Sequence, residues 1–330
     1  MTRPRIVIVG AGFAGYHAAR TLSRLLRGRA DIALLNPTDY FLYLPLLPEV
    51  AAGVLEPTRV TVPLANTLPG VRIVIGEADH IDLQGRRVSF NQPEGGRGEL
   101  AYDRLILAVG SVNKLLPIPG ITEHAHGFRG LPEAIYLHDH LVRQIELADN
   151  TDNPVERDAR CTFVVVGAGY TGTEVVAHGQ LFTDQLVAHH PRLKGLCRWM
   201  LLDVADRVLP EMDPRMSETA RRVLEARGIE VCLGTSVKEA AADGVHLTNG
   251  RFVPTRSLIW CVGVRPDPLV AALGLETVKG RLVVDEFLNV PGHPEVFACG
   301  DAAAVPVLNQ PGRIAPMTAQ HAQRQGKLAA

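Results

Sequence analysis

The chain has 330 residues, a formal net charge of −1, and contents of 46% hydrophobic and 5% aromatic residues. This length allows two domains with complete cores, and the near-zero charge gives no electrostatic reason to expect nucleic acid or an anionic membrane as a partner. The longest apolar runs fall short of the roughly 18 residues of a membrane-spanning helix. The first apolar segment begins so close to Met1 that no room remains for a signal peptide.

Cysteine and histidine usage indicates neither a disulfide framework nor a metal site. The five cysteines are scattered singly, and the twelve histidines form no ligand pair on a recognisable helix. These features predict a cytoplasmic protein without a bound metal. Spacing along the chain leaves open whether two of the cysteines meet in space. The cysteines are Cys161, Cys197, Cys232, Cys261 and Cys299.

The first part of the chain reads as alternating strands and helices. The apolar run Arg5–Val9 predicts a buried strand, a glycine turn follows, and a helix is expected over Gly15–Leu26. Ile32–Leu35 is the next strand. Three short strands are expected to form an antiparallel piece: Val71–Gly76, His80–Leu83 and Val88–Phe90. Asp103–Val109 is a further buried strand that ends at Gly110-Ser111.

A proline-rich crossing at Leu115–Gly120 marks a domain boundary, and a helix is expected over Leu131–Asn150. The polar stretch Asn150–Arg160 is interpreted as a loop. The strand Cys161–Val166 then opens a second unit with its own glycine turn and helix.

The second unit continues with Trp199–Asp203 as its next strand. The helix Pro214–Arg227 is ended by Gly228. The remaining elements are the strand Ile229–Leu233, a hairpin of Val245–Leu247 and Arg251–Pro254 around Asn249-Gly250, and the strand Ser257–Val262. The chain closes with Leu282–Val284, Val296–Cys299, Gly300-Asp301 and a helix from about Pro316.

This order predicts an α/β protein with two Rossmann-like dinucleotide-binding domains, the second inserted into the first. We expect residues 1–118 and 285–330 to form one domain, and residues 119–284 to form the inserted one.

The most informative feature is a glycine signature that occurs twice. Gly10, Gly12 and Gly15 follow the first strand, and the same spacing returns at Gly167, Gly169 and Gly172. In a strand–turn–helix context, such a turn lets backbone N–H groups approach a pyrophosphate, and the helix N-terminus stabilises its charge. Two copies predict two bound dinucleotides, which a protein normally uses to pass electrons between them.

An acidic residue at the end of the second strand usually bonds the adenosine ribose in this fold. In the first unit that position is Asn36, an unusual choice that still offers a hydrogen bond; the alternative is a degraded site that binds nothing. In the second unit it is Asp203, which favours NADH because a carboxylate repels the 2′-phosphate of NADPH. Arg207 lies nearby and would soften that preference. A solvated loop aspartate is the alternative.

Three more side chains are candidates by position. Glu174, placed in the first turn of the second unit's helix, would line the junction of nicotinamide and flavin, or would simply suit a helix N-terminus. Asp301 follows a strand end and would accept hydrogen bonds from ribityl hydroxyls, unless Gly300-Asp301 is an ordinary turn. Gln320 opens the last helix, whose N-terminus would stabilise a reduced flavin, or is an ordinary exposed glutamine. The apolar segment Phe41–Pro48 would wall a flat ring or form a core loop.

The chain resembles the flavoproteins with two dinucleotide-binding domains, and among them the type II NADH dehydrogenases, which are non-proton-pumping NADH:quinone oxidoreductases. The resemblance runs through nearly the whole chain. The segments that carry it are GAGFAG, NPTDYFLYLPLLPEVAAG, YDRLILAVGS, GAGYTGTE, LIWCVGVRPDP, HPEVFACGDAA and PMTAQHAQRQGK.

What the resemblance implies is FAD in the first domain and NADH in the inserted one. Gly10, Gly12 and Gly15 would hold the FAD pyrophosphate, Asn36 its ribose and Asp301 its ribityl chain. Gly167, Gly169 and Gly172 would hold NADH, with Asp203 on its ribose and Glu174 beside the nicotinamide. Pro45, Ala319 and Gln320 would lie at the flavin and the quinone pocket, with Glu174 and Gln320 as the catalytic pair. Further cofactor contacts are implied at Phe13, Ala14, Ala108, Gly110, Gly263 and Gly300.

Three features depart from this family. Asn36 replaces the usual acid, Val109 stands where a threonine is common, and the chain stops within its last helix at Gly326–Ala330. The family continues into a C-terminal module that attaches the protein to the membrane and often makes dimer contacts. We therefore expect a fragment or a natural short form. Peripheral attachment at the inner face of the cell membrane and a homodimer are implied by the family alone.

The expected reaction is hydride transfer from NADH to FAD followed by reduction of a quinone. No redox cysteine pair is needed for it. One alternative is a soluble NADH-dependent reductase of a small iron–sulfur carrier. A sulfide:quinone oxidoreductase is disfavoured because that chemistry needs positioned cysteines. A non-catalytic protein that binds FAD and senses NADH is the remaining alternative, favoured by Asn36 and the missing C-terminus.

Overall fold

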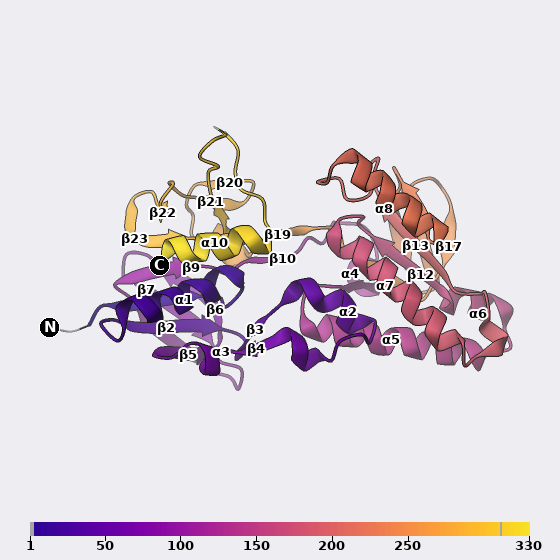
Figure 1. Ribbon diagram of the computed structural model, residues 1–330, viewed down its shortest axis with the longest axis horizontal. Helices are drawn as coiled ribbons and strands as arrows, with labels where there is room; N and C mark the ends of the chain where they lie inside the picture. Colours follow the sequence, from indigo (N-terminus) through magenta and orange to yellow (C-terminus); the bar gives the residue numbers. More distant parts are fainter. Residues whose placement is uncertain (1–2, 311) are drawn as a thin grey trace. The chain divides into compact units, whose positions relative to one another are not determined.

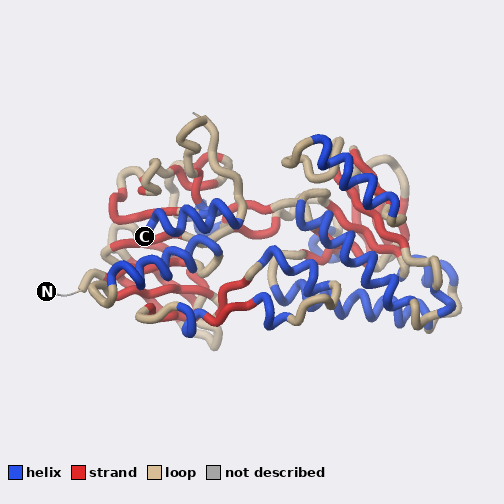
Figure 2. The backbone as a smooth tube through the Cα atoms, viewed as in Figure 1, coloured by secondary structure: helices blue, strands red, loops and turns tan. Residues whose placement is uncertain are grey.

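The computed structural model describes residues 3–310 and 312–330, and its contacts divide the chain into two compact units. The first unit contains residues 1–42, 61–112 and 265–330, and the second contains residues 43–60 and 113–264. The chain therefore crosses between units at residues 112 and 264, whereas the sequence placed the boundaries at 118 and 284. The excursion of residues 43–60 into the second unit was not foreseen. Figure 2 shows helices and strands following one another in both units.

The first unit is built on a six-stranded sheet in the order β22-β23-β9-β1-β2-β5, in which all neighbours but β22 and β23 pair in parallel. Most of its strands are buried on both faces, as expected of a sheet covered by helices. Helices α1 and α10 lie side by side in this unit (Figure 1). The strands and helices are β1 (Arg5–Val9), β2 (Asp31–Asn36), β5 (Val71–Ile75), β9 (Arg104–Leu107), β22 (Asn289–Val290), β23 (His293–Ala298), α1 (Phe13–Leu26) and α10 (Ala319–Ala329).

Smaller elements complete the first unit. One antiparallel sheet contains β6 (Glu77–Asp82), β7 (Arg87–Asn91) and β8 (Arg97–Ala101). The remaining elements are β3 (Tyr40–Leu42), β4 (Thr61–Pro63), α3 (Leu64–Thr67), α9 (Pro268–Ala272), β20 (Thr277–Val278), β21 (Arg281–Val283) and β24 (Ala303–Ala304). The strands β10 (Ser111–Asn113) and β19 (Val264–Pro266) lie where the chain crosses between units.

The expected antiparallel piece was wrong in one strand. β5 extends the parallel sheet instead, with Ile32 opposite Val71 and Leu34 opposite Ile73. A parallel edge strand and an antiparallel strand share the same short apolar pattern, so residue type does not distinguish them. The true third strand, β8, was missed because its sequence RGELA offers a single buried apolar side chain, Leu100.

The second unit is built on a parallel sheet in the order β11-β18-β12-β13-β14. The predicted hairpin around Asn249-Gly250 is confirmed. The elements of the sheet are β11 (Ala125–Gly127), β12 (Thr162–Val166), β13 (Arg198–Asp203), β14 (Glu230–Leu233) and β18 (Ser257–Trp260). The others are α2 (Leu47–Ala51), α4 (Ile121–His124), α5 (Leu131–Asp149), α6 (Pro154–Arg160), α7 (Tyr170–Val187), α8 (Pro214–Ala226), β15 (Val237–Ala241), β16 (Gly244–Leu247) and β17 (Phe252–Pro254).

Helix α7 packs on the sheet of the second unit through Trp199. The indole of Trp199 stacks on Phe163 with ring centroids 4.7 Å apart, and its Nε1 donates to Thr183 Oγ1 at 2.9 Å. A Cβ on Gly179 would collide with this ring, so glycine is required for the helix to sit at this depth. The packing holds α7, and with it the glycine turn before α7, against the sheet.

The short helix α2 explains why residues 43–60 belong to the second unit. It packs against α5 and α7, and Leu47, Val50 and Ala51 are buried. A five-residue helix has little stability alone. Tertiary packing, rather than local propensity, therefore decides its place.

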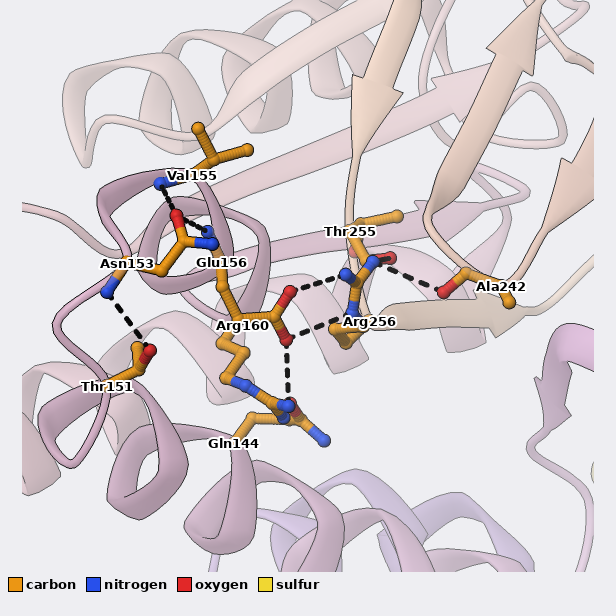
Figure 3. Close-up of polar contacts among 9 residues, drawn as sticks. All are labelled: Gln144, Thr151, Asn153, Val155, Glu156, Arg160, Ala242, Thr255 and Arg256. Atoms are coloured by element: carbon orange, nitrogen blue, oxygen red, sulfur yellow. Dashed lines mark hydrogen bonds and ion pairs between the residues drawn. The ribbon is translucent and has the colours of Figure 1, made fainter.

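The predicted loop at 150–160 was also wrong, because residues 154–160 form α6. Asn153 caps the helix, its Oδ1 accepting from the backbone N–H groups of Val155 at 3.0 Å and Glu156 at 3.4 Å (Figure 3). Pro154 occupies the first helical turn, where a missing N–H costs nothing. The Glu156 carboxylate then accepts a hydrogen bond from Arg256 Nη2 at 2.5 Å and forms an ion pair with Arg160 Nη2 at 2.8 Å. The Asn-Pro-x-Glu spacing was a readable helix start.

Among the described residues, no helix combines the length and apolar content needed to cross a bilayer.

The capping of α6 yields a stability prediction. Asn153→Ala removes the acceptor of two helix N–H groups and should lower the free energy of unfolding by about 1 kcal/mol. Chemical denaturation followed by circular dichroism measures this loss. Asn153→Asp keeps an acceptor at the cap and should remain within about 0.5 kcal/mol of the wild type. Equal losses in both variants would contradict the capping role.

Candidate functional site

The two glycine turns share one backbone geometry. Gly10 and Gly167 have φ angles of 94° and 105°, a region that side chains rarely adopt. The N–H of Gly10 donates to Leu35 O at 2.8 Å, and the N–H of Gly167 donates to Leu202 O at 2.8 Å. A backbone hydrogen bond thus fixes each turn to the end of the neighbouring parallel strand.

The third glycine of each turn permits close packing of helix on strand. A Cβ on Gly15 would overlap Gly10 O, and a Cβ on Gly172 would overlap Gly167 O in the same way. A Cβ on Gly10 would likewise overlap Ala108 O. These positions are therefore required by the fold, whatever binds nearby.

The second glycine of each turn faces open space. A Cβ on Gly12 or on Gly169 would meet no heavy atom of the described chain within 4 Å, and both residues have ordinary φ angles of −68° and −73°. They are the N-caps of α1 and α7, and their lack of a side chain leaves the first-turn N–H groups without a side-chain cap. We call this open space and the uncapped N–H groups next to it the cradle of each unit. The cradle suits an anion, since helix N–H groups and the helix dipole both favour negative charge.

Asn36 and Asp203 perform the same structural task in the two units. Asn36 Oδ1 accepts from Ala11 N at 2.8 Å, and Asp203 Oδ2 accepts from Ala168 N at 2.5 Å. Each side chain braces the turn that precedes the helix. The amide is therefore an adequate replacement for an acid in this task.

The two side chains differ in their remaining capacity. Asn36 Nδ2 donates both of its hydrogens, to Thr38 O at 2.9 Å and Thr38 Oγ1 at 3.0 Å. The second oxygen of Asp203 accepts from Ala205 N at 2.8 Å, and a carboxylate retains further lone pairs. Asp203 therefore offers more free acceptor lone pairs to the O–H of a ribose than Asn36 does.

The other candidates of the first unit gather at the carboxyl ends of neighbouring strands. Ala108 follows β9 and donates its N–H to Val9 O at 2.9 Å, and Gly110 has a φ of 76°. Gly300 and Asp301 follow β23. Ser111 Oγ donates to Asp301 Oδ2 at 2.5 Å. The carboxyl edge of a parallel sheet is where such folds bind ligands.

Two buried polar residues near this edge were not found from the sequence. Gln325 is 7% exposed, and its Oε1 accepts from Gly300 N at 2.8 Å, which ties α10 to the turn after β23. Arg281 is 5% exposed and donates Nη1 to Ala315 O at 2.7 Å. Its Nε and Nη2 have no hydrogen-bond partner within the described chain. Burial lowers the pKa of Arg281, and the carboxylate of Asp301 opposes that shift.

Phe13 and Ala14 belong to the start of α1. Phe13 makes an edge-to-face contact with Phe41 at 5.0 Å, and Tyr16 stacks on Phe41 at 4.7 Å. Ala14 is buried. A Cβ on Gly326 of α10 would collide with the carbonyl oxygen of Ala14, so α10 crosses α1 closely at this point.

The segment Phe41–Pro48 is in part a core segment, and its role as the wall of a flat ring stays a prediction. Phe41 is 5% exposed and belongs to the core of the first unit. Pro45 is exposed in a 3₁₀ turn over Leu44–Leu46 and is grouped with the second unit, whereas the other residues proposed for FAD lie in the first.

Helix α10 begins one residue before Gln320. Thr318 caps it, and Ala319 and Gln320 occupy its first turn. Gln320 is exposed and Ala319 is partly buried. The predicted helix opening is confirmed, and the roles of both residues stay predictions.

The sequence predicted Glu174 in the first turn of α7, and this prediction was wrong. The helix begins at Tyr170, so Glu174 is its fifth residue, and its position does not reflect the preference of acids for a helix N-terminus. Partial desolvation and, secondarily, the negative charge of Glu49 raise the pKa of Glu174. Glu49 comes from α2, which no sequence pattern connects with α7. Gly263, with a φ of 67°, follows the carboxyl end of β18 in the sheet of the second unit.

No group of three or more His, Cys, Asp or Glu residues in the described ranges is arranged to hold a metal ion.

Comparison with known proteins adds to this geometry. Residues 4–326 match the family described as pyridine nucleotide-disulphide oxidoreductase. The chain is 33% identical over 319 residues to the type II NADH:quinone oxidoreductase NdhA of Mycobacterium tuberculosis, covering 92% of this chain and 67% of that one. It is 29% identical to an external alternative NAD(P)H-ubiquinone oxidoreductase of Arabidopsis thaliana, mitochondrial, covering 92% and 55%.

Among solved structures, the fold is similar to that of NDH2 from Plasmodium falciparum in complex with NADH. The TM-score is 0.86 at 21% identity, covering 92% of this chain and 65% of that one. The chain thus spans about two thirds of the length of this structure and of the mycobacterial relative.

The open cradles predict separable binding defects. Gly12→Ala should lower the FAD content of the purified protein, and Gly169→Ala should raise the Kd for NADH about tenfold or more, because a methyl group fills the space that a phosphate needs. Fluorescence titration and flavin absorbance measure these effects. In the cofactor-free form, both variants should keep the unfolding temperature of the cofactor-free wild type, since the added Cβ meets nothing. Wild-type NADH affinity in Gly169→Ala would refute the assignment of that turn.

The raised pKa of Glu174 predicts a pH-dependent stability. The folded state holds a proton that the unfolded state releases, so stability falls as pH rises from the ordinary glutamate range through the raised pKa. Glu174→Gln should therefore raise the unfolding temperature by about 1 °C at neutral pH, with no gain at low pH. Differential scanning fluorimetry across pH measures it.

Glu218→Gln is the matched control for this effect. A hydrogen bond from Arg221 lowers the pKa of Glu218, so this variant should lose stability at neutral pH, and the loss should vanish as the wild-type carboxylate becomes protonated. A loss of stability in Glu174→Gln at neutral pH would contradict the proposed electrostatic environment.

Proposed function

Because the chain belongs to the pyridine nucleotide-disulphide oxidoreductase family, we propose that it oxidises NADH with an FAD cofactor and reduces a quinone. The observation that carries this proposal is the duplicated glycine turn, with an open second glycine in each copy. The mycobacterial relatives named as NADH:quinone oxidoreductases support the reaction.

We propose that the first unit holds FAD. Gly10, Gly12 and Gly15 would bind the pyrophosphate, Asn36 the ribose and Asp301 the ribityl chain. The fit rests on the open cradle at Gly12 and on the buried Arg281, whose Nε and Nη2 offer donors to a ligand near Asp301. When bound, FAD supplies acceptance of a hydride and release of electrons to a second substrate.

The chain's own contribution at this site is electrostatic and structural. The first turn of α10, which contains Ala319 and Gln320, would stabilise negative charge through its helix dipole. Gln325 holds that helix against Gly300 by a buried hydrogen bond. The remaining contacts proposed in this unit are Phe13, Ala14, Ala108 and Gly110.

We propose that the second unit holds NADH. Gly167, Gly169 and Gly172 would bind the pyrophosphate, Asp203 the ribose and Glu174 the region of the nicotinamide, with Gly263 nearby. Arg207 Nη2 donates to Pro210 O at 2.6 Å, which uses one of its five N–H donors. The proposed preference for NADH over NADPH rests on Asp203, whose carboxylate would repel the 2′-phosphate.

The quinone site and the cellular setting rest on the family resemblance. By the family resemblance, Pro45, Ala319 and Gln320 are proposed to lie at the flavin and the quinone. Attachment at the inner face of the cell membrane and a homodimer are proposals of the same kind. Flotation with liposomes and light scattering of the purified protein test these two proposals.

The decisive experiment is an anaerobic titration of the purified protein with NADH, followed by addition of a quinone. We expect a yellow protein that is bleached by one equivalent of NADH and regains its colour on adding the quinone. Reoxidation that is faster with a small iron–sulfur protein would favour a soluble reductase. Binding of both nucleotides without turnover would favour an NADH-sensing protein. A colourless protein that takes up no FAD would refute the proposal.

A further inference from the structure

Two cysteines that are far apart in the sequence meet in the second unit. Cys161 directly precedes β12 and Cys197 directly precedes β13. These strands pair in parallel with Thr162 opposite Arg198, so the two cysteines are neighbours one position earlier. The backbone N–H of Arg198 donates to Cys161 O at 2.8 Å, which closes the pairing at this point.

The side chains of the pair also interact, since each thiol shifts the pKa of the other. Adjacent strands lie about 4.8 Å apart, and a disulfide joins residues whose Cα atoms are roughly 4.4–6.8 Å apart. A covalent bond between the two sulfurs therefore needs little backbone movement. All five cysteines are free thiols in this structure.

The environment of the pair differs from that of the other three cysteines. Cys161 is buried, whereas Cys197 is partly exposed and gives solvent access to the pair. The hydrogen bond from Cys197 lowers the pKa of Cys161, and the same contact raises that of Cys197 because the two share one negative charge. Burial raises the pKa of Cys261 and Cys299 to about 12 and, with the nearby Glu230, that of Cys232 to about 11.

We propose that Cys161 and Cys197 form an oxidisable dithiol that closes to a disulfide in the presence of hydrogen peroxide. When the charge shared by the pair is on Cys197, its accessible thiolate attacks hydrogen peroxide, becomes a sulfenic acid and releases one water. Cys161 then attacks that sulfur, forms the S–S bond and expels the second water. Overall, two thiols and one hydrogen peroxide give one disulfide and two water molecules, and an added thiol reverses the bond.

The position of the Cys161–Cys197 disulfide determines which part of the fold it would constrain. The segment between the two cysteines contains β12, the turn Gly167–Gly172 and all of α7. Cys161 and Cys197 lie before the amino ends of β12 and β13, whereas Gly167 and Asp203 lie at the carboxyl ends, six residues and about 20 Å further along each strand. The disulfide would act as a covalent clasp on this strand–helix unit, remote from the proposed dinucleotide contacts.

The test combines mass spectrometry with thermal unfolding of the full chain. After treatment with hydrogen peroxide, non-reducing proteolysis should give one peptide pair linked through Cys161 and Cys197, and the titratable thiols should fall from five to three. The unfolding temperature should rise by about 5 °C or more, because the link restricts the unfolded chain, and should return on adding dithiothreitol.

Two variants distinguish the clasp from general oxidation. Cys197→Ser should lose the linked peptide and the thermal shift, and Cys232→Ser should keep both. Five free thiols after peroxide treatment of the wild type would overturn the proposal. A thermal shift of the same size in Cys197→Ser would also overturn it.

Discussion

Each unit depends on a contact between strand and helix that only glycine permits. At Gly15 and at Gly172, the helix passes so close to the preceding turn that a Cβ would overlap a carbonyl oxygen of the turn. Gly12 and Gly169, the N-caps of these helices, have open space beside them and leave the first-turn N–H groups without a side-chain cap. A closely packed helix start and a cradle suited to an anion therefore lie together, and this combination occurs twice in the chain.

A polar side chain at the end of the next strand completes each turn. Asn36 and Asp203 accept a hydrogen bond from the residue after the first glycine, and both thereby hold the turn in its conformation. The atypical amide of the first unit is consistent with this structural task. Since both N–H donors of Asn36 are bonded to Thr38, a ribose contact at this residue would depend on the remaining acceptor capacity of Oδ1. The two units therefore share a scaffold while differing in the charge that they offer to a ligand.

Several features of the proposed site come from residues that no local pattern connects. Burial and, secondarily, the charge of Glu49 raise the pKa of Glu174, and Glu49 is nearby because α2 packs on α5 and α7. Gln325 binds Gly300, and Arg281 is buried near Asp301 with two donors left open within the described chain. These contacts join segments that are distant in sequence, and they determine the electrostatics around the candidate residues.

The sequence by itself determined the α/β class, both glycine turns, the hairpin at Asn249-Gly250 and the start of the last helix. These features depend on local requirements, namely a positive φ, a missing side chain or a cap at a fixed spacing. The Asn153 cap of α6 was equally local and was overlooked in a polar stretch. Only the tertiary structure decided the parallel pairing of β5, the transfer of residues 43–60 to the second unit and the meeting of Cys161 with Cys197. Packing of distant segments sets these features, and spacing along a single chain does not encode which segments become neighbours.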